Sequence, residues 1–488
     1  MESNYYTLPS SRDIKVLDRF SLLADIDDNG NDPSSLEDPA TGLVPFWPLL
    51  QSLLHPKNKI ETLPELTSLL DTISVTLRGT SNPAGDYGLL KEAIPSRCNG
   101  GEGFFFNQVW PRLAQLALQM PALFPSGRLP ALGTGPGAVN ELVLSRRQVA
   151  CLVVHQFFRT LLAPEWKREE DGFHDFGLWY PGMEEERQPS AARAYLAALM
   201  RYLEEVSCRD EVVDDGEWEV AYNLRSVKGR DFMELLQSSG CPLGEVEVKV
   251  VERYDILPAS LGISGGAAVV SANKYIGFGK SATQEEIHVG SSPEACPAVL
   301  ITPPLRDDQV LIVRGAQPMV NITGQRRDIR VEEMPVPDGG GKAWRERTML
   351  FMDALELDMA EAKESLPDLL PGNLDREIRK AYTAFSSRRV REIRTGLWGC
   401  GAFCGDPGIK GLLLWLAASL ANTRLLIVCD RGGLGFAKEF QCAVNEIRRT
   451  IRDTAALREL LDRVPDSLAR GRTLSWVIEQ LEQRPVVG

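Results

Sequence analysis

Histidine is scarce in this sequence, and its cysteines follow no metal-binding pattern. The four histidines are His55, His155, His174 and His288. The nine cysteines are scattered from Cys98 to Cys442, and the close pair Cys400 and Cys404 has no second pair near it. Structural zinc sites need several such ligands at regular spacing. We therefore expect no metal site, and the odd, unpatterned cysteines indicate free thiols in a reducing, intracellular compartment.

Long apolar runs and an excess of positive charge are also missing. The longest apolar stretch, GLLLWLAASLA (Gly411–Ala421), is shorter than the roughly 20 residues of a membrane-spanning helix and predicts a buried helix. The net charge is -13, which argues against a broadly basic surface and against direct DNA binding. An anionic ligand would need backbone amides, helix N-termini or a local basic patch. We expect no membrane segment, and a nuclear or cytoplasmic protein.

What remains is an ordinary globular composition, with 43% hydrophobic and 25% charged residues among 488. This length suffices for two or three domains. In the first half, Val109–Phe124 and Leu144–Leu162 repeat apolar residues at helical spacing, and Ser145 is a candidate N-cap. The polar, proline-containing stretch Ala163–Ala192 indicates a connecting segment between domains, and Ala192–Val206 predicts another helix.

Beyond Gly244 the pattern changes to short apolar strands that alternate with helices. The predicted strands are Gly244–Glu252, Gly266–Ala272, Gln309–Gly315, Arg347–Leu355 and Arg424–Asp430. Such alternation is typical of an α/β layer structure with a largely buried sheet.

Two glycine-rich loops lie among the predicted strands and helices of this part of the chain. The first glycine loop (Gly277–Thr283) comes after the strand that ends near Ala272, and the second glycine loop (Gly396–Asp406) leads into a predicted helix. In α/β sheets, ligands bind beyond the strand ends, where loops meet helix N-termini. Glycines let backbone amides approach an anion closely. The two loops together therefore predict a phosphate-binding site.

Two adjacent glutamates follow the first glycine loop, and they permit two interpretations. Thr283 to Glu286 fits the capping-box pattern, so Glu286 could simply close a helix, and Glu285 could be a solvated acid of its first turn. Alternatively, neighbouring residues on a helix point about 100° apart. One carboxyl could then hold sugar hydroxyls while the other gives a proton to a glycosidic oxygen, as glycoside cleavage commonly requires.

These residues together resemble the poly(ADP-ribose) glycohydrolases of the larger, eukaryotic type. The family signature, a glycine triplet followed by Gln-Glu-Glu, is similar to Gly277–Gly279 and Gln284–Glu286 here, in a shortened form like that of fungal members. GLWGCGAFCGD resembles the family's second phosphate loop. WPRLAQLALQMP and RRQVACLVVHQFF resemble segments of its helical accessory domain. The resemblance runs from about Phe105 to about Asp430.

The resemblance implies an α/β macrodomain, with a mixed sheet flanked by helices, beside an N-terminal all-helical accessory domain. We place the helical domain and its connection at residues 1–190 and the macrodomain-like catalytic domain at residues 191–488. The implied enzyme is a glycosidase that hydrolyses ribose–ribose O-glycosidic bonds of poly(ADP-ribose) on modified proteins, and that releases ADP-ribose. The implied protein acts in the DNA damage response as a monomer and needs no metal or organic cofactor. An ADP-ribose-binding macrodomain reader and a mono-ADP-ribosyl hydrolase are the alternatives.

The resemblance also implies roles for individual residues. Glu286 would be the catalytic acid and Glu285 would hydrogen-bond ribose hydroxyls. The implied substrate-binding residues are Asn273, Gly277, Phe278, Gly279, Gln284, Gly399, Cys400, Gly401, Ala402, Phe403 and Gln325.

Three of this chain's residues differ from animal members of the family. Gln325 stands where those proteins have an adenine-stacking tyrosine, Leu397 where they have asparagine, and Asp430 where they have phenylalanine. The family's adenine-contacting acid would fall near Asp255 or Ile256.

Overall fold

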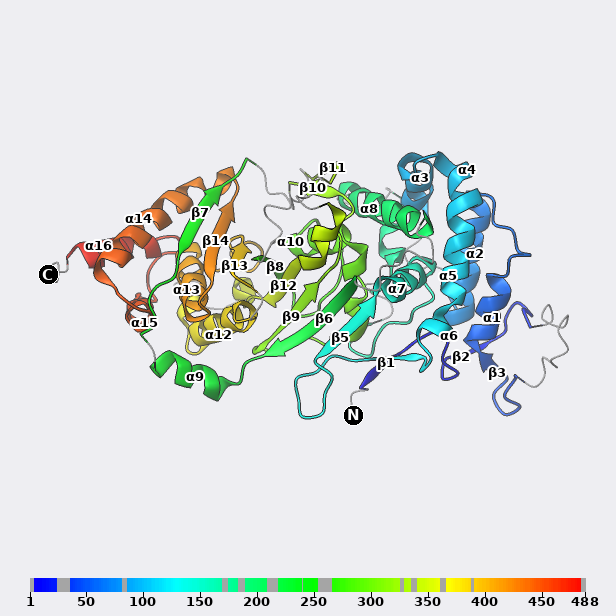
Figure 1. Ribbon diagram of the computed structural model, residues 1–488, viewed down its shortest axis with the longest axis horizontal. Coiled ribbons are helices and arrows are strands. Elements are labelled where there is room, and N and C mark those ends of the chain that lie inside the picture. The colour runs from blue at the N-terminus through cyan, green and yellow to red at the C-terminus, as the bar shows by residue number, and fades with distance from the viewer. Residues whose placement is uncertain are drawn as a thin grey trace.

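An eight-stranded mixed sheet forms the centre of the computed structural model (Figure 1). The structure describes residues 4–23, 36–80, 86–168, 174–182, 189–208, 218–238, 240–252, 266–324, 329–334, 340–359, 366–387 and 390–483. The strand order is β5-β6-β9-β12-β8-β13-β14-β7. In chain order these strands are β5 (Glu141–Ser145), β6 (Glu219–Ser226), β7 (Val246–Val250), β8 (Gly266–Ala272), β9 (Gln309–Arg314), β12 (Thr348–Asp353), β13 (Glu392–Thr395) and β14 (Arg424–Cys429). The five strands predicted from the sequence are confirmed.

The parallel half of the sheet determines where the glycine loops lie. β12, β8, β13, β14 and β7 pair in parallel, whereas β9 pairs antiparallel with β12 and β6. Carboxyl ends of parallel strands meet at one edge of a sheet, where ligands bind in such folds. Because β8 and β13 are neighbours, the first glycine loop and the second glycine loop leave the sheet at the same edge.

Each face of the sheet is covered by a hydrophobic core of its own. Successive side chains of a strand point to opposite faces, and on β8 Val269 packs into one core while Val270 packs into the other. The Val269 core contains the C-terminal helices α12 (Asn373–Phe385), α13 (Pro407–Leu420), α14 (Leu434–Thr450), α15 (Thr454–Asp462) and α16 (Thr473–Glu482). Every residue from Gly408 to Leu420 is buried, so the buried helix predicted there is confirmed.

The Val270 core joins the sheet to the helices of the N-terminal part, which lie at one end of the molecule (Figure 1). These helices are α1 (Phe46–Leu53), α2 (Leu63–Arg78), α3 (Gly88–Arg97), α4 (Gly101–Phe104), α5 (Trp110–Leu118), α6 (Met120–Leu123), α7 (Arg146–Phe158) and α8 (Pro189–Cys208). Ser145 caps α7 through a capping box with Gln148, as its sequence predicted. β5 also comes from this part, so a strand pairing with β6 ties it to the sheet.

The remaining elements are short or peripheral. They are β1 (Tyr5–Thr7), β2 (Lys15–Leu17), β3 (Leu43–Pro45), β4 (Arg128–Pro130), β10 (Asn321–Thr323), β11 (Arg330–Glu332), α9 (Gly229–Ser238), α10 (Gln284–Gly290) and α11 (Ala298–Ile301). The short 3-10 helix η5 (Phe176–Trp179) lies in the connecting segment. No helix in the described ranges is both long enough and apolar enough to span a membrane.

Candidate active site

A cavity of about 1120 Å³ opens where β8, β13 and β14 end. Its wall contains twelve of the residues singled out from the sequence: Asn273, Gly277, Phe278, Gly279, Gln284, Glu285, Glu286, Gly399, Cys400, Gly401, Ala402 and Phe403. Leu397 and Asp430 line it too. Gln325, Asp255 and Ile256 lie outside the described residues. The structure thus brings both glycine loops and both glutamates to one cavity, although more than 100 residues of sequence separate the loops.

Glu286 lies in the cavity wall and also closes a helix. Its Oε2 accepts hydrogen bonds from the backbone N–H groups of Ser281 (2.8 Å) and Thr283 (3.0 Å), while Thr283 Oγ1 accepts one from Glu286 N. This is the capping box that the sequence left as an alternative. The two interpretations are therefore compatible, because the capping contacts hold a half-buried carboxyl in place at the cavity.

Glu285 is the buried member of the pair, with 7% of its surface exposed. Its Oε2 accepts from Asn273 N at 2.8 Å and its Oε1 accepts from Gly277 N at 3.3 Å. Burial raises the pKa of Glu285 to about 8, although these two hydrogen bonds and the charge of Lys167 act in the opposite direction. The carboxyl of Glu285 is therefore protonated near neutral pH, and it is not the solvated acid of the alternative interpretation.

Gly279 has no side chain where the carboxyl of Glu286 passes. A Cβ atom built on Gly279 would overlap Glu286 Oε1. The backbone oxygen of Gly279 accepts a hydrogen bond from Trp179 Nε1 at 2.9 Å, so the connecting segment holds this loop from outside. The buried Ala282 has φ +56°, a left-handed conformation that is uncommon for residues other than glycine. The loop is thus bent tightly just before Glu285 and Glu286.

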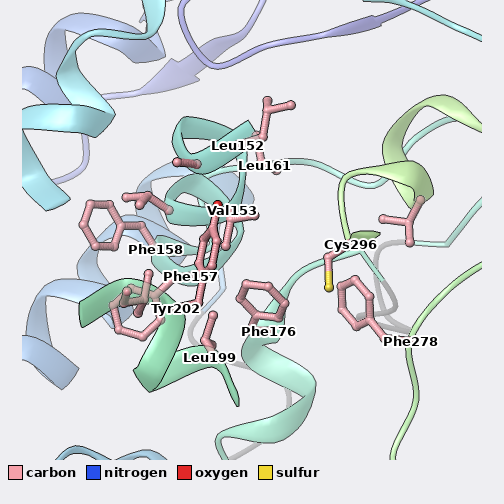
Figure 2. Close-up of a cluster of buried hydrophobic side chains, with 14 of the residues drawn as sticks. Leu152, Val153, Phe157, Phe158, Leu161, Phe176, Leu199, Tyr202, Phe278 and Cys296 are labelled. Atoms are coloured by element: carbon pink, nitrogen blue, oxygen red, sulfur yellow. The ribbon is translucent and has the colours of Figure 1, made fainter. Parts of the chain in front are cut away.

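The ring of Phe278 packs into the protein core. It is 2% exposed, and its centroid lies 5.5 Å from that of Phe176 and 5.3 Å from that of Trp179. Figure 2 shows Phe278 pointing toward Phe176 and Cys296. The geometry gives the ring an anchoring function for the first glycine loop, and the residue also belongs to the cavity wall.

Gln284 uses its amide group to bind the end of β8. Its Oε1 accepts from Ser271 N at 3.1 Å and its Nε2 donates to Val269 O at 3.3 Å. These contacts fix the start of α10 to the strand. The side chain of Gln284 therefore positions the two glutamates that follow it.

The second glycine loop requires glycine at position 399. Gly399 has φ +74°, and a Cβ atom there would lie 2.7 Å from Ala354 Cβ. A Cβ atom on Gly401 would meet nothing within 4 Å. Asp406 ends the loop and caps α13, because its side chain accepts from Ile409 N at 2.9 Å. The glycines let the backbone of this loop approach an anion closely, whereas the first turn of α13 is already capped by Asp406.

Several cavity or support residues were missed by the sequence analysis. Trp166, Lys167 and Arg168 line the cavity, although they belong to the stretch interpreted only as a connection. Arg470 holds the second glycine loop from the C-terminal segment. Its Nη2 donates to Cys400 O and to Gly405 O, both at 3.0 Å. Neither Trp166–Arg168 nor Arg470 belongs to a periodic pattern or a motif in the sequence. Only the folded structure shows that these residues reach the cavity or its loops.

The cavity wall also contains two cysteines, Cys400 and Cys429. All nine cysteines are free. Burial raises the pKa of the Cys400 thiol to about 12, so it is a poor nucleophile. Within the described part of the chain, no three or more His, Cys, Asp or Glu side chains are grouped to hold a metal ion.

Two family models match the chain. Residues 245–432 match the model described as "Poly (ADP-ribose) glycohydrolase (PARG), Macro domain fold", and residues 100–217 match the model described as "Poly (ADP-ribose) glycohydrolase (PARG), helical domain". The two matches together cover more than half of the chain. The predicted macrodomain, with a mixed sheet flanked by helices and a helical accessory domain before it, is confirmed.

Individual relatives are similar at lower identity. Poly(ADP-ribose) glycohydrolase 1 of Arabidopsis thaliana is 22% identical, over 77% of this chain and 85% of that protein. Poly(ADP-ribose) glycohydrolases 1 and 2 of Caenorhabditis elegans are 28% and 27% identical over 33% and 34% of this chain. The matches span only 22% and 38% of those nematode proteins.

A solved structure is similar as well. The glycohydrolase of Deinococcus radiodurans in complex with ADP-ribose is 17% identical, covering 46% of this chain and 94% of that chain, with a TM-score of 0.31. A TM-score this low supports no argument. The matches to the two family models carry the assignment: the chain belongs to the poly(ADP-ribose) glycohydrolase family.

Proposed function

We propose that this protein is a hydrolase that cleaves the ribose–ribose O-glycosidic bonds of poly(ADP-ribose) and releases ADP-ribose. One observation carries the proposal: two adjacent carboxyls, Glu285 and Glu286, lie in the wall of one cavity together with two glycine loops. Glycoside hydrolysis needs a carboxyl proton donor, and an ADP-ribose unit brings a diphosphate that glycine loops can hold. Membership of the family supports the same activity.

We assign the diphosphate to the backbone of the two glycine loops. Gly277–Gly279 and Gly399–Phe403 line the cavity and present no acidic side chain. Because the net charge is -13, the protein as a whole repels anions. A diphosphate therefore has to be held by local groups, such as the backbone amides of these loops. The half-buried Phe403 would pack on the adjoining ribose, and Asn273 would contact another ribose.

We assign the proton donation to Glu286. Its carboxyl is half-buried at the cavity and is oriented by two backbone amides. The C–O bond to the leaving ribose breaks as its oxygen takes the proton, and an oxocarbenium-like centre forms at the anomeric carbon. Water then adds to that carbon and gives its proton to the carboxylate of Glu286.

Glu285 would support this step in two ways. Its carboxyl is protonated near neutral pH, since burial raises its pKa to about 8, so it adds no negative charge beside the substrate's diphosphate. Its oxygens are fixed by Asn273 N and Gly277 N, which places them to hydrogen-bond ribose hydroxyls.

The oligomeric state, the location in the cell and the limits of the two parts are also proposals. We propose a monomer that acts inside the cell, in the nucleus or the cytoplasm, on poly(ADP-ribosyl)ated proteins in the DNA damage response. We also propose a division into a helical part with its connection at residues 1–190 and a catalytic part at residues 191–488. The likeness of the first glycine loop to fungal members stays a prediction.

The test is to incubate the protein separately with purified poly(ADP-ribose) and with mono-ADP-ribosylated protein, and to measure released ADP-ribose. We expect release from the polymer. Release only from the mono-modified protein would identify a mono-ADP-ribosyl hydrolase. Binding of ADP-ribose without release from either substrate would identify a reader.

A further inference from the structure

The basic residues in the described wall of the cavity are Lys167 and Arg168, which are neighbours in the sequence. The acidic residues of the wall are Glu285, Glu286 and Asp430. The charge of Lys167 lowers the pKa of Glu285 against the larger effect of burial, so this cation lies within electrostatic reach of the reacting pair. All positive charge of the described wall is therefore concentrated on one short segment beside the glutamates.

This segment comes from the opposite side of the glutamates to the second glycine loop. It follows α7, and the connecting segment it begins leads to α8, which packs on α10. In Figure 1, α7 and α8 lie to one side of α10, whereas β13, α13 and β14 lie to the other. The second glycine loop joins β13 to α13. We therefore expect the glutamates, at the start of α10, to lie between the backbone amides of one loop and the cations of the connecting segment.

Two aromatic side chains of the cavity wall are neighbours in sequence of groups that act on Glu285: Trp166 precedes Lys167, and Tyr275 is two residues from Asn273. Trp166 precedes the cations, and its enclosed indole N–H has no hydrogen-bond partner within the described ranges. Tyr275 is 48% exposed and follows β8, close to Asn273, whose Oδ1 accepts from Tyr275 N at 3.0 Å. Exposed aromatic rings beside cations are the groups that bind single-stranded nucleic acids by stacking on bases.

The cavity is also larger than a pocket that binds one small molecule usually is. Its volume of about 1120 Å³ exceeds the roughly 300–1,000 Å³ typical of pockets for a single small molecule. Space therefore remains beyond the unit that the two glycine loops would hold.

We propose that Trp166, Lys167, Arg168 and Tyr275 form a leaving-unit subsite. This subsite would bind the ADP-ribose unit on the far side of the bond that is cleaved. Lys167 and Arg168 would contact its diphosphate, and Trp166 and Tyr275 would contact its base. The proposal rests on the proposed function, and it gives the enzyme a means to prefer polymer, because free ADP-ribose has no second unit.

The first experiment compares the double variant Lys167→Ala, Arg168→Ala with wild type. KM for poly(ADP-ribose) is measured at several salt concentrations, and Kd for free ADP-ribose is measured by calorimetry. Charge-assisted hydrogen bonds contribute about 1.5–3 kcal/mol, so the ratio of KM for polymer to Kd for ADP-ribose should rise about tenfold or more. The salt dependence of KM should also become shallower, because fewer phosphates are neutralised.

A matched control separates this effect from net charge. The double variant Lys57→Ala, Lys438→Ala changes the charge equally at exposed positions outside the cavity wall, and should leave the ratio unchanged. An unchanged ratio in the Lys167, Arg168 variant overturns the subsite. Failure of the wild type to release ADP-ribose from polymer overturns the proposed function instead, so the two failures are distinguishable.

The second experiment tests the aromatic half of the subsite. Tyr275→Ala removes an exposed ring, so the core stays intact. Stacking on a base contributes about 1–3 kcal/mol, so KM for polymer should rise about fivefold or more relative to Kd for ADP-ribose. An unchanged ratio would remove Tyr275 from the subsite.

Discussion

At the scale of single residues, the function depends on how two adjacent carboxyls differ. Glu285 is buried against backbone amides, whereas Glu286 is half-buried and belongs to a capping box. The sequence alone left open whether Glu286 closes a helix or meets a substrate. In the structure Glu286 does both: it closes the capping box of α10 and it lines the cavity. This is possible because the cap and the cavity wall meet at the start of α10.

The first prediction concerns Glu286→Gln. Glutamine keeps the capping box, since this motif accepts Glu or Gln at the third position, so the fold should be preserved. Loss of the proton donor should lower kcat on poly(ADP-ribose) by about 10²–10⁴-fold while ADP-ribose still binds. Steady-state kinetics and calorimetry check this, with Glu439→Gln on the exposed face of α14 as a matched control. Turnover near wild type would remove Glu286 from the mechanism.

The second prediction concerns pH. The pKa of Glu285 is raised to about 8. As pH rises through about 8, this carboxyl ionises and adds a negative charge to the cavity that has to hold the substrate's diphosphate. The value of kcat/KM should therefore fall on the alkaline side with a midpoint near pH 8, and Glu285→Gln should lack this limb. If kcat/KM of the wild type stays constant as pH rises through 8, this prediction is wrong.

The carboxyl of Glu285 should also affect how the stability of the folded protein depends on pH. Its pKa in the folded state exceeds the ordinary value of 4.5, so the folded protein holds a proton that the unfolded chain releases. The unfolding free energy of the wild type should therefore fall, relative to Glu285→Gln, as pH rises from about 4.5 to about 8. Urea unfolding at several pH values measures the difference.

The third prediction concerns Gly279→Ala. The added Cβ would overlap Glu286 Oε1, which lies at the end of a flexible side chain. Glu286 can move aside at small cost in folding, but the proton donor is then misplaced. We expect polymer hydrolysis to fall by about 10²-fold or more with little change in the unfolding temperature. Gly103→Ala, at an exposed position outside the cavity wall where a Cβ atom meets nothing within 4 Å, is the control.

At the scale of elements, the sequence predicted the helices and strands whose pattern lies within one short stretch of the chain. The first glycine loop follows the short apolar strand β8, and each glycine loop leads into a helix with a polar N-cap, Thr283 or Asp406. Strands β5, β6 and β13 were missed, because they are short or polar and their place in the sheet depends on partners distant in sequence. Trp166–Arg168 were missed for the same reason, since only the folded chain brings them to the cavity.

The fourth prediction concerns the support of the second glycine loop. Arg470 is exposed, yet its guanidinium donates to the carbonyl oxygens of Cys400 and Gly405. Arg470→Ala should loosen the loop and raise Kd for ADP-ribose about two- to tenfold, since single hydrogen bonds contribute about 0.5–1.5 kcal/mol. Arg470→Lys should recover part of the affinity.

The control for this positioning function is Arg472→Ala, which removes an exposed arginine two residues away. It should leave Kd for ADP-ribose unchanged. Equal affinities for Arg470→Ala and wild type would show that the loop holds its shape without the C-terminal segment.

At the scale of the whole molecule, helix α10, which carries both glutamates, lies between two parts of the chain. α10 is fixed to the sheet by Gln284 and packs on α8, which shares the Val270 core with the N-terminal helices. The contact is closest at Gly290, where a Cβ atom would overlap the buried ring of Tyr195. Composition and periodicity predicted both parts, but they gave no information on this contact, which joins residues almost 100 positions apart.

The fifth prediction therefore concerns Gly290→Ala. Inserting a methyl group into a well-packed core typically costs about 1–3 kcal/mol, so the unfolding free energy should fall by that amount. Gly435→Ala on the exposed start of α14 is the matched control, because its Cβ meets nothing within 4 Å and alanine favours helix by about 0.5–1 kcal/mol. Since Gly290 ends the helix that Glu285 and Glu286 begin, displacement of α10 from α8 should lower kcat on polymer together with stability. A variant that loses stability but keeps full kcat would show that α10 is positioned by β8 alone, and that the helical part acts on the cavity only through its connecting segment.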